Sequence, residues 1–542
     1  MNRYYELSCH GVISSYGGIG SLIETPEGSL QIQPLEKWPY FIHEVDGKDR
    51  ETVNSISVQD HRLISRLKAT FPNLTYLLKV PSNSTTHSGH KVASDTSLIS
   101  AEFFPQWMFC PVCKRFMKYS DWQHRYKMTN LKGRFNLYCP DCQMASGAKK
   151  AKYILLEQVR FIQVSEAGQI GDFPWEDWFN DKDLGAEKCE KHEFMYRSSA
   201  NRDNLGSIWI SCKRCKLSVN LSGIFNPASD KESMQTVLKS SNSVYFPEIL
   251  RSLMIPVSKR SSEDDPGSEM NYRCDEFEYM ISKAKNDDFA DEDPIYLKSM
   301  PPITNTISLI SIRTLSMATV LCSYSRINPI SSGTIFETGK SRHVTNAGEK
   351  TRYLPSVELA GEGFLMVFDD LAIRKWYLTA QQHESFRQRF SNHSEALKNF
   401  NPFGNDNITG YALYKYILLH TISHLLIKQL EFVCGYPASS LSERIYCSSG
   451  FHAGIMIYTV AGSEGSYGGI VTITERGDLR QLLAEAFDKA RFCTNDPVCN
   501  SNNSVCFSCS LLPETSCESF NLLLDRALVI NDDYGFIKAL SR

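Results

Sequence analysis

The sequence predicts an α+β protein built from several modules, on three observations. A chain of 542 residues is too long for one hydrophobic core, because cores stop growing at roughly 250–300 residues and longer chains divide. Its composition, 42% hydrophobic and 22% charged, is that of an ordinary folded protein. Strand and helix patterns both occur, and cysteine clusters recur in the first half and near the C-terminus. We therefore expect zinc-ribbon-like knuckles in the first half and a mixed strand and helix, cysteine-rich domain at the C-terminal end.

These patterns divide the chain into four modules. We expect an N-terminal β-rich module over residues 1–100, two cysteine clusters in a zinc-ribbon-like region over 101–226, a middle α/β module over 227–400, and a cysteine-rich zinc-binding domain over 401–542. Ser, Asp, Glu and Lys are abundant over 261–293. Such a composition indicates a solvated polar linker, with a short helix inside it, within the middle module.

Local patterns predict several individual elements. Alternating residues around Ser29–Gln33 predict a pair of short strands, and the apolar spacing of His61–Leu67 predicts a helix. In the last module, Tyr411–Phe432 is apolar around most of its circumference, which is typical of a helix that is buried on all sides. The segments that follow are expected in the order strand, strand and helix: Ile455–Val460, Ile470–Ile473 and Leu479–Arg491.

Charge and cysteine content limit the possible partners and compartment. A formal net charge of −3 and a pI near 6.5 provide no overall attraction to nucleic acid, so DNA contact requires a local patch or a partner. The chain has no run of about 18 apolar residues and no export-signal pattern near its first residues, so we expect a cytoplasmic protein that does not contact a membrane. In a reducing compartment, the 17 cysteines are better explained as metal ligands and small buried residues than as disulfides.

The first cysteine cluster consists of two Cys-X2-Cys pairs, Cys110 with Cys113 and Cys139 with Cys142, separated by 25 residues. Two thiolates on one tight turn can bind one ion, and two such turns complete the tetrahedron that zinc prefers, with Zn–S distances of about 2.3 Å. We expect the insert between the pairs to form the hairpin of the ribbon. Four core cysteines without a metal are the less favoured alternative.

The second cluster offers a Cys3His set: Cys189, His192, Cys212 and Cys215. A cysteine pair that is structural without a metal remains the alternative. Basic residues border the set: Lys213, Arg214 and Lys216. These cations could contact phosphate, although cations beside thiolate-bound zinc also offset the negative charge of the site.

The third cluster contains five cysteines for the four places on one ion: Cys493, Cys499, Cys506, Cys509 and Cys517. The compact run from Cys499 to Cys517 can close on itself with short loops, whereas Cys493 lies at the end of the preceding predicted helix. We therefore expect Cys499, Cys506, Cys509 and Cys517 to be the ligands. All three clusters lack the open position with a neighbouring acid or base that hydrolytic zinc requires, so we expect two to three structural zinc ions and no catalytic residue.

Two further motifs resemble catalytic sites without meeting their requirements. Gly333–Ser341 resembles a phosphate-binding loop, but five residues separate its glycines where that loop needs about four. His420 and His424 are spaced i and i+4 as in metalloproteases, but Thr421 stands where the general-base glutamate is needed. The apolar sequence around the two histidines favours satisfied core histidines over a catalytic zinc site.

Ordered segments in the C-terminal module carry a resemblance to a known family. In chain order they are Leu418–His424, Cys434–Tyr436, Ser440–Tyr446, Gly454–Tyr458, Glu464–Gly469, Asp496–Cys499, Pro513–Cys517 and Leu524–Arg526. This order resembles the cysteine-rich domain shared by DrmB-family proteins and mitomycin-repair helicases. The resemblance to the DrmB family continues upstream through Tyr16–Gly20, Phe104–Trp107, Asp172–Trp175, Val244–Pro247, Leu354–Glu358 and Gly361–Gly363.

The resemblance implies membership of DISARM or a related bacterial antiviral defence system. In such a system this subunit pairs with a DrmA-like superfamily 2 helicase and the pair engages DNA, while a methyltransferase marks self DNA. The helicase motor would then lie in the partner. The chain departs from the family pattern at Ser165 and Gln169, where family members typically have Cys and Gly-His ahead of the segment Asp172–Trp175.

Two other functions remain open beside a non-enzymatic zinc-binding subunit. One is a metal-dependent nuclease or protease that uses His420, His424 and nearby acids. The other is a stand-alone DNA-binding protein, although the near-neutral charge and the lack of a recognition-helix pattern do not favour it.

Overall fold

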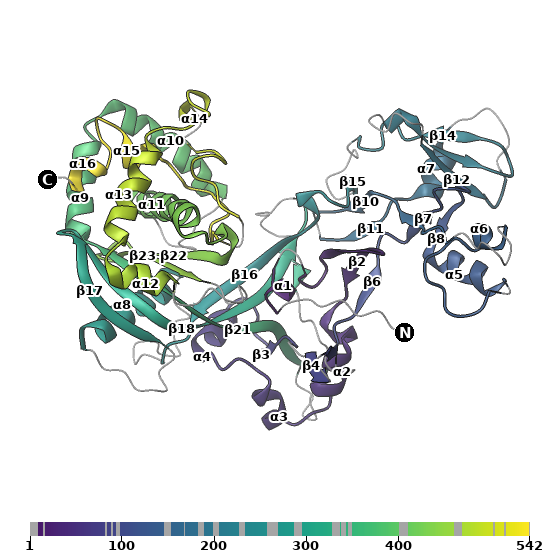
Figure 1. Cartoon of the computed structure of the whole chain (residues 1–542), viewed down its shortest axis with the longest axis horizontal. Helices are drawn as coiled ribbons and strands as arrows, with labels where there is room; N and C mark the ends of the chain where they lie inside the picture. The colour runs from purple at the N-terminus through teal and green to yellow at the C-terminus, as the bar shows by residue number, and fades with distance from the viewer. Residues whose placement is uncertain are drawn as a thin grey trace. The chain divides into compact units, whose positions relative to one another are not determined.

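In the computed structural model of the chain (Figure 1), elements can be described over most of the sequence. The described residues are 9–14, 17–81, 84–87, 90–93, 98–129, 131–145, 153–166, 168–182, 189–198, 205–226, 234–256, 269–286, 295–327, 336–337, 343–344, 350–399, 410–459, 469–501, 505–513 and 516–540. The phosphate-loop-like segment Gly333–Ser341 lies outside them, except for the short strand Phe336–Glu337.

The residues group into two compact units, each assembled from separate stretches of sequence. Unit 1 comprises 1–57, 78–250 and 320–356, and unit 2 comprises 58–77, 251–319 and 357–542. Both units mix helices and strands, and cysteine clusters occur in the first half of the chain and near the C-terminus, which confirms the predicted α+β class. The finer division into four modules stays a prediction.

Unit 1 contains several small antiparallel sheets. In hydrogen-bonded order, they are β1 (Leu22–Thr25), β2 (Gly28–Ile32) and β6 (Ala101–Phe103); β8 (Phe116–Lys118), β7 (Trp107–Phe109) and β9 (Glu157–Gln158); β11 (Ile170–Asp172), β10 (Phe161–Val164) and β15 (Gln235–Leu238); β12 (Phe194–Ser198), β13 (Ile208–Cys212) and β14 (Ser218–Asn220); and β4 (Ser84–His87) with β5 (His90–Ala93). Its helices are α1 (Cys9–Val12), α2 (Pro39–Glu44), α3 (Arg50–Ser55), α5 (Tyr119–Lys127), α6 (Pro140–Ala145) and α7 (Trp175–Asp181). The predicted strand pair around Ser29–Gln33 is the β1–β2 hairpin.

A larger sheet includes two strands of 19 residues each, β18 (Ile307–Ser325) and β21 (Lys350–Phe368). Its main path follows the order β16 (Phe246–Leu253), β18, β21, β23 (Ala453–Thr459) and β22 (Leu441–Cys447). Further strands pair with the two long ones: β17 (Tyr296–Thr304) and β19 (Phe336–Glu337) with β18, and β3 (Leu74–Lys79) and β20 (His343–Val344) with β21. Because β18 and β21 are so long, each contributes residues to both units.

Helix α11 (Gly410–Cys434) lies at the centre of unit 2, surrounded by other helices and by β22 and β23 (Figure 1). Every residue from Ala412 to Ile427 is buried, which confirms the helix predicted from its all-round apolar pattern. The other helices of unit 2 are α4 (His61–Leu67), α8 (Glu269–Asn286), α9 (Asp370–Ala380), α10 (Glu384–Asn399), α12 (Gly469–Arg476), α13 (Leu479–Ala490), α14 (Val498–Ser501), α15 (Ala527–Ile530) and α16 (Ile537–Leu540). Among the described residues, no helix has both the length and the hydropathy needed to span a bilayer.

Two local predictions in unit 2 are wrong. The segment Ile470–Ile473 is predicted as a strand, but it belongs to helix α12, in which Ile470 and Thr474 are buried four residues apart. The polar segment 261–293 contains the 18-residue helix α8, which is longer than the short solvated helix expected. Its buried residues Tyr272, Phe277 and Met280 follow helical spacing, so this face packs into the core. The predicted helices His61–Leu67 and Leu479–Arg491 are confirmed as α4 and α13.

A buried charge network joins α8 to the sheet of unit 2. Arg444 on β22 is only 1% exposed and donates to both oxygens of Glu276, from Nε to Oε2 at 2.7 Å and from Nη2 to Oε1 at 2.9 Å. Its Nη1 atom donates to Glu518 Oε1 at 3.0 Å. The hydroxyl of Tyr446 and the backbone N–H of Leu253 also donate to Glu276. The carboxylate is thus fully paired inside the protein, as a buried charge requires.

Replacing Glu276 should therefore destabilise unit 2 strongly. We expect Glu276→Ala to lower the free energy of unfolding by about 3–5 kcal/mol, because it leaves the guanidinium of Arg444 buried with one partner removed. Denaturant unfolding measures this change. The exposed Glu431 serves as control, and Glu431→Ala should change stability by no more than about 0.5 kcal/mol. Equal effects of the two substitutions would contradict the role assigned to the network.

Candidate metal centres

Potential metal ligands converge in four places among the described residues. Within each group the ligand atoms lie within 4.8 Å of one another. The groups are Cys110, Cys113, Cys139 and Cys142; Cys189, His192, Cys212 and Cys215; Cys493, Cys499, Cys506 and Cys509; and His420, His424, Glu443 and Cys517. We refer to them as site 1, site 2, site 3 and site 4.

Site 1 brings together the four cysteines expected from the sequence. Cys110 and Cys113 form the turn between β7 and β8, and the N–H of Lys114 donates to the carbonyl of Cys110 at 2.9 Å, with Lys114 at a φ of 64°. Cys139 immediately precedes α6, which contains Cys142. The insert between the two pairs contains β8 and helix α5 and is not the hairpin expected, because Trp122 of α5 is buried and donates to the carbonyl of Met108 at 3.1 Å.

The sulfur positions of site 1 fit a tetrahedral zinc ion. Cys110 and Cys142 Sγ atoms are 3.7 Å apart, and Cys113 and Cys139 Sγ atoms are 3.6 Å apart. A tetrahedron with Zn–S bonds of about 2.3 Å has edges of about 3.8 Å, whereas a disulfide would require about 2.05 Å. The separations therefore match a metal site and not a cross-link.

Site 2 repeats the same turn on another sheet. Cys212 ends β13, and Cys215 follows it before β14 begins. The N–H of Lys216 donates to the carbonyl of Cys212 at 3.0 Å, with Lys216 at a φ of 65°, as Lys114 does in site 1. The structure brings Cys189 Sγ to 3.6 Å from Cys212 Sγ. All four residues predicted from the sequence are therefore together.

The imidazole of His192 is oriented toward the thiols of site 2. Its Nδ1 atom is 3.3 Å from Cys189 Sγ and 4.0 Å from Cys215 Sγ. Its Nε2 atom is 3.0 Å from Oδ1 of Asn180, an oxygen that only accepts hydrogen bonds. The proton therefore resides on Nε2, and the lone pair of Nδ1 is directed at the metal position, the arrangement that metal-binding histidines require.

The basic residues beside site 2 differ in their contacts. Lys213 and Lys216 are exposed, whereas Arg214 donates from Nε to Glu193 Oε1 at 2.7 Å. Lys213 and Lys216 thus present their charges at the surface next to the site, while the charge of Arg214 is partly offset.

Site 3 differs from the set expected from the sequence, because it contains Cys493 in place of Cys517. The Sγ atoms of Cys493 and Cys506 are 3.4 Å apart, and those of Cys499 and Cys509 are 3.6 Å apart. The chain reverses after α13 because Arg526 donates to both oxygens of Asp496 at 3.0 Å and to the carbonyl of Ala490. This reversal returns Cys493 to the other three cysteines, which sequence spacing alone does not indicate.

Site 4 contains Cys517 together with two histidines of α11 and a carboxylate of β22. His420, His424, Glu443 and Cys517 are each no more than 4% exposed. Burial lowers the pKa of His420 and raises the pKa of the Cys517 thiol. The histidines are buried and hydrogen-bonded to backbone carbonyls, as the sequence predicted, but Glu443 was not singled out there, because nothing in its local sequence distinguishes it from other acids.

Sites 1 and 3 each contain one cysteine whose pKa is lowered, which favours the thiolate, the form in which cysteine binds metal. In site 1, hydrogen bonds from Cys113 and Cys139 lower the pKa of Cys110 to about 2. In site 3, burial opposes ionisation, but hydrogen bonds from Cys493 and Asn495 lower the pKa of Cys506 to about 6. In the same clusters, the hydrogen bond to Cys110 raises the pKa of Cys113 to about 11 and burial raises the pKa of Cys493, so these thiols stay protonated until a cation binds.

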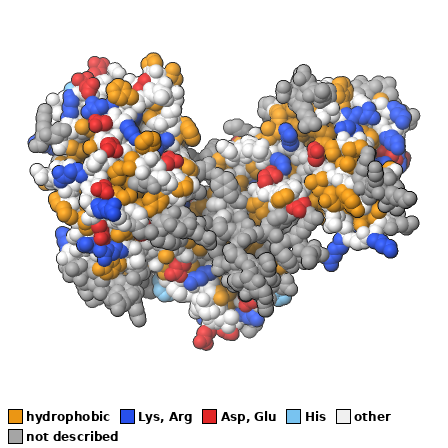
Figure 2. Space-filling view, viewed as in Figure 1, with side chains coloured by type: hydrophobic (Ala, Val, Ile, Leu, Met, Phe, Trp, Pro, Cys, Tyr) orange, Lys and Arg blue, Asp and Glu red, His pale blue; other side chains and the backbone are white. Residues whose placement is uncertain are grey.

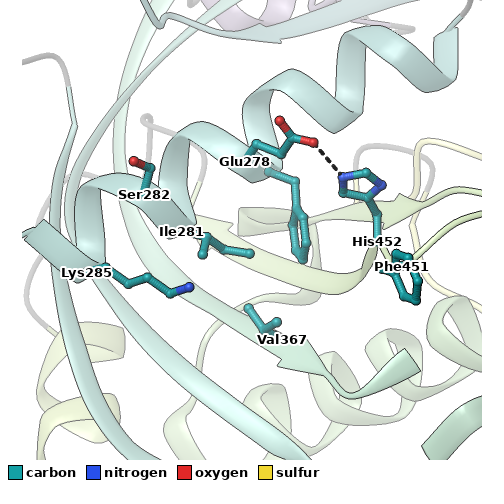
Figure 3. A pocket seen from close by; sticks show the side chains of 8 residues that line it. Glu278, Ile281, Ser282, Lys285, Val367, Phe451 and His452 are labelled. Atoms are coloured by element: carbon teal, nitrogen blue, oxygen red, sulfur yellow. Dashed lines mark hydrogen bonds and ion pairs between the residues drawn. The ribbon is translucent and has the colours of Figure 1, made fainter. Parts of the chain in front are cut away.

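A pocket of about 420 Å³ lies elsewhere on unit 2 (Figure 3). Phe277 and Ile281 of α8 line it together with Val367, and Lys285 lies at its rim. His452 contributes the main polar contact, from Nε2 to Glu278 Oε1 at 3.1 Å (Figure 3). The same ring contacts Ser448 Oγ at 2.8 Å through Nδ1, so both ring nitrogens have partners.

Large apolar side chains are exposed around site 3. Between 66% and 84% of the surface of each is accessible, and they are Phe432, Phe492, Val498 and Phe507. Phe492, Val498 and Phe507 each adjoin a cysteine of the site in sequence, and the Nζ atom of Lys489 lies 3.6 Å from the ring centre of Phe432. We call these four residues the apolar rim. Exposed apolar groups gathered in this way are typical of contact surfaces.

Comparisons with known proteins point to the same chemistry. Residues 422–510 match the MrfA Zn-binding domain, and residues 10–249 match a domain of unknown function, DUF8724. The chain is 26% identical over 484 residues to the DISARM protein DrmB of Bacillus paralicheniformis, with 72% of this chain and 82% of that protein aligned. The zinc-binding match includes all of site 3 and, from site 4, His424 and Glu443. Together with the cysteine clusters, it indicates zinc as the metal.

The orientation of His192 provides a test of site 2. We expect Asn180→Ala to weaken zinc binding at this site by roughly 10–100-fold, the usual effect of removing the hydrogen-bond partner of a metal-binding histidine. Competition with a coloured chelator measures the loss. Asn73→Ala, at an exposed position, is the control and should leave the affinity unchanged. Undiminished zinc affinity in the Asn180 variant would contradict the role assigned to Asn180 in orienting His192.

Proposed function

On the premise that the comparisons assign the chain to the DrmB family, we propose that it is a non-catalytic zinc-binding subunit of a DISARM-type bacterial antiviral defence system. In this proposal the chain pairs with a DrmA-like superfamily 2 helicase in the cytoplasm and supports the engagement of DNA by that helicase. The similarity to a DISARM protein over most of both chains supports the first part. The composition of the metal sites supports the absence of catalysis.

The observation that carries the proposal is that each cysteine cluster provides a full set of ligands. Sites 1, 2 and 3 each contain four side chains that can bind one ion. A tetrahedral zinc ion with four protein ligands has no open position for water or substrate, which is the property of structural zinc sites. We infer that sites 1 to 3 bind one zinc ion each and that these ions stabilise the fold.

A nuclease or protease that uses His420 and His424 is less well supported. Both side chains have no exposed surface, so a substrate would have no access to them. Thr421, which stands at the position of the general base, donates its hydroxyl to the carbonyl of Ile417 at 2.7 Å. The same hydroxyl accepts a hydrogen bond from the backbone N–H of Asp525 at 2.9 Å, and a neutral hydroxyl is too weak a base to take the proton that hydrolysis requires.

The region that contains sites 1 and 2 is the part of the chain best suited to DNA. Residues 101–226 contain 19 Lys and Arg against 14 Asp and Glu, while the whole chain has a net charge of −3. Basic side chains gather over this part of unit 1, near β12, β14, α5 and α6, on the face shown in Figure 2. Exposed Lys213 and Lys216 would contact phosphates, which give affinity without sequence specificity.

The apolar rim of site 3 is the surface that we assign to the helicase. Its exposed aromatic side chains belong to the residue types that dominate protein interfaces. Site 3 would keep the loop that presents Phe507 rigid, since the flanking residues Cys506 and Cys509 are both members of the site. A rigid loop loses little conformational entropy on binding.

Co-expression with a DrmA-like helicase tests the pairing. We expect a complex that survives size-exclusion chromatography and a purified chain without ATPase or nuclease activity of its own. Phe432→Ser with Phe507→Ser should reduce recovery of the helicase, whereas Phe451→Ser, at a residue that is 77% exposed outside the apolar rim, should not. Robust ATPase or nuclease activity of the isolated chain, or no retained helicase, would refute the proposal.

Substitution of the two exposed lysines tests the DNA contact. We expect Lys213→Ala with Lys216→Ala to weaken DNA binding by the complex similarly for unrelated sequences. The slope of log affinity against log salt should fall by about one for each lost phosphate contact. Lys375→Ala, at an exposed lysine of α9, is the matched control. An unchanged salt slope in the double variant would show that these lysines do not contact phosphate.

A further inference from the structure

Site 4 unites side chains from three segments in the interior of unit 2. The Nε2 atoms of His420 and His424 are 2.9 and 3.1 Å from the same oxygen, Oε1 of Glu443. His420 Nε2 is also 3.2 Å from Cys517 Sγ. We propose that these four residues bind one zinc ion, separate from the ions of the three cysteine clusters. The inference goes beyond the proposed function and does not depend on it.

The direction of the hydrogen bonds carries the argument. His420 Nδ1 is 3.2 Å from the carbonyl oxygen of Leu523, and His424 Nδ1 is 2.7 Å from the carbonyl oxygen of Ser510. A carbonyl oxygen only accepts, so each Nδ1 atom carries the proton of a neutral imidazole. Each Nε2 atom then carries a lone pair and no proton. The two lone pairs converge on a carboxylate oxygen and a sulfur. Acceptors facing acceptors in a buried space require a cation or additional protons between them.

Protons alone satisfy this arrangement incompletely. A metal-free interior needs one proton on the Cys517 thiol, directed at His420, and another between His424 and Glu443. His420 Nε2 still faces Glu443 Oε1 at 2.9 Å with no proton between them. A divalent cation replaces both protons and lies opposite all four ligand atoms. With one thiolate, one carboxylate and two neutral imidazoles, its two positive charges are balanced, which suits a site without solvent.

The distances and surrounding contacts suit zinc. Tetrahedral zinc with Zn–N bonds of about 2.0–2.1 Å and a Zn–S bond of about 2.3 Å places neighbouring ligand atoms about 3.3–3.6 Å apart. The observed separations of 2.9 to 3.2 Å require outward movement by only a few tenths of an ångström. The backbone N–H groups of Ser519 and Asn521 donate to Cys517 Sγ at 3.3 Å, and such bonds stabilise a thiolate.

The second oxygen of Glu443 is already engaged, which leaves Oε1 as the metal-binding atom. This second oxygen, Oε2, accepts a hydrogen bond from the hydroxyl of Ser423 on α11. Ligating carboxylates are commonly held by such a partner. The ion would therefore join α11, β22 and the segment around Cys517, and with four protein ligands and no solvent access it would be structural.

Zinc-edge anomalous diffraction from crystals of the full chain tests the proposal directly. We expect four anomalous peaks, one in each of sites 1 to 4, and four zinc ions per chain by elemental analysis of the protein in solution. Peaks at the three cysteine clusters without one among His420, His424, Glu443 and Cys517 would overturn it. This outcome would leave the proposed helicase subunit intact, because that function requires no fourth ion.

Cobalt substitution with two matched cysteine variants provides an independent test. Cys517→Ser should remove the cobalt absorption of a site with one thiolate and preserve the intense thiolate-to-cobalt bands of the cysteine clusters. Cys493→Ser should weaken those bands and preserve the signal of site 4. An unchanged cobalt count and spectrum in Cys517→Ser would overturn the proposal. Should this variant not fold, the anomalous peaks of the native chain decide the question.

Discussion

Burial of α11 is the constraint on which unit 2 depends. This helix carries a lysine and two histidines into a region without solvent, and each of these polar groups must find a partner there. Lys415 donates to Asp370 Oδ1 at 2.6 Å and to the carbonyl of Gly450, and the histidines contact the segment from 510 to 523. The elements around α11 are therefore positioned by directional contacts as well as by apolar packing.

The metal sites of the two units serve different structural purposes. Zinc in sites 1 and 2 would hold short strands and turns at the edge of small apolar clusters, in which Cys110, Cys139 and Cys212 are themselves buried. Site 4 lies inside a core that is already extensive, where it joins segments that are remote in sequence. Site 3 and site 4 are linked by two adjacent residues. Cys509 belongs to site 3, and the next residue, Ser510, provides the carbonyl that orients His424 of site 4.

The parts of the structure that depend on local sequence could be predicted. The apolar spacing of α4, α11 and α13 is set within each helix, and two cysteines with two residues between them define a turn by themselves. The strand predicted at Ile470–Ile473 is wrong because Ile470 and Thr474 are buried on one face of helix α12, and this packing depends on the surrounding fold. The choice between Cys493 and Cys517 depended on Arg526 and on α11, both distant in sequence, so spacing could not settle it.

Unit 2 is built from three separate stretches of sequence, so its packing partners are synthesised at different times. The carboxylate of Glu276 meets Arg444 across 168 residues of chain, an interval of roughly 10–30 s at common ribosomal rates of about 5–20 residues per second. The cysteines of site 1 all lie between residues 110 and 142, so that site can close while translation continues. The core of unit 2 includes Tyr534 and Phe536, so it is completed only after these residues have left the ribosome. Until then, α11 lacks the C-terminal part of the apolar surface that covers it, including α15.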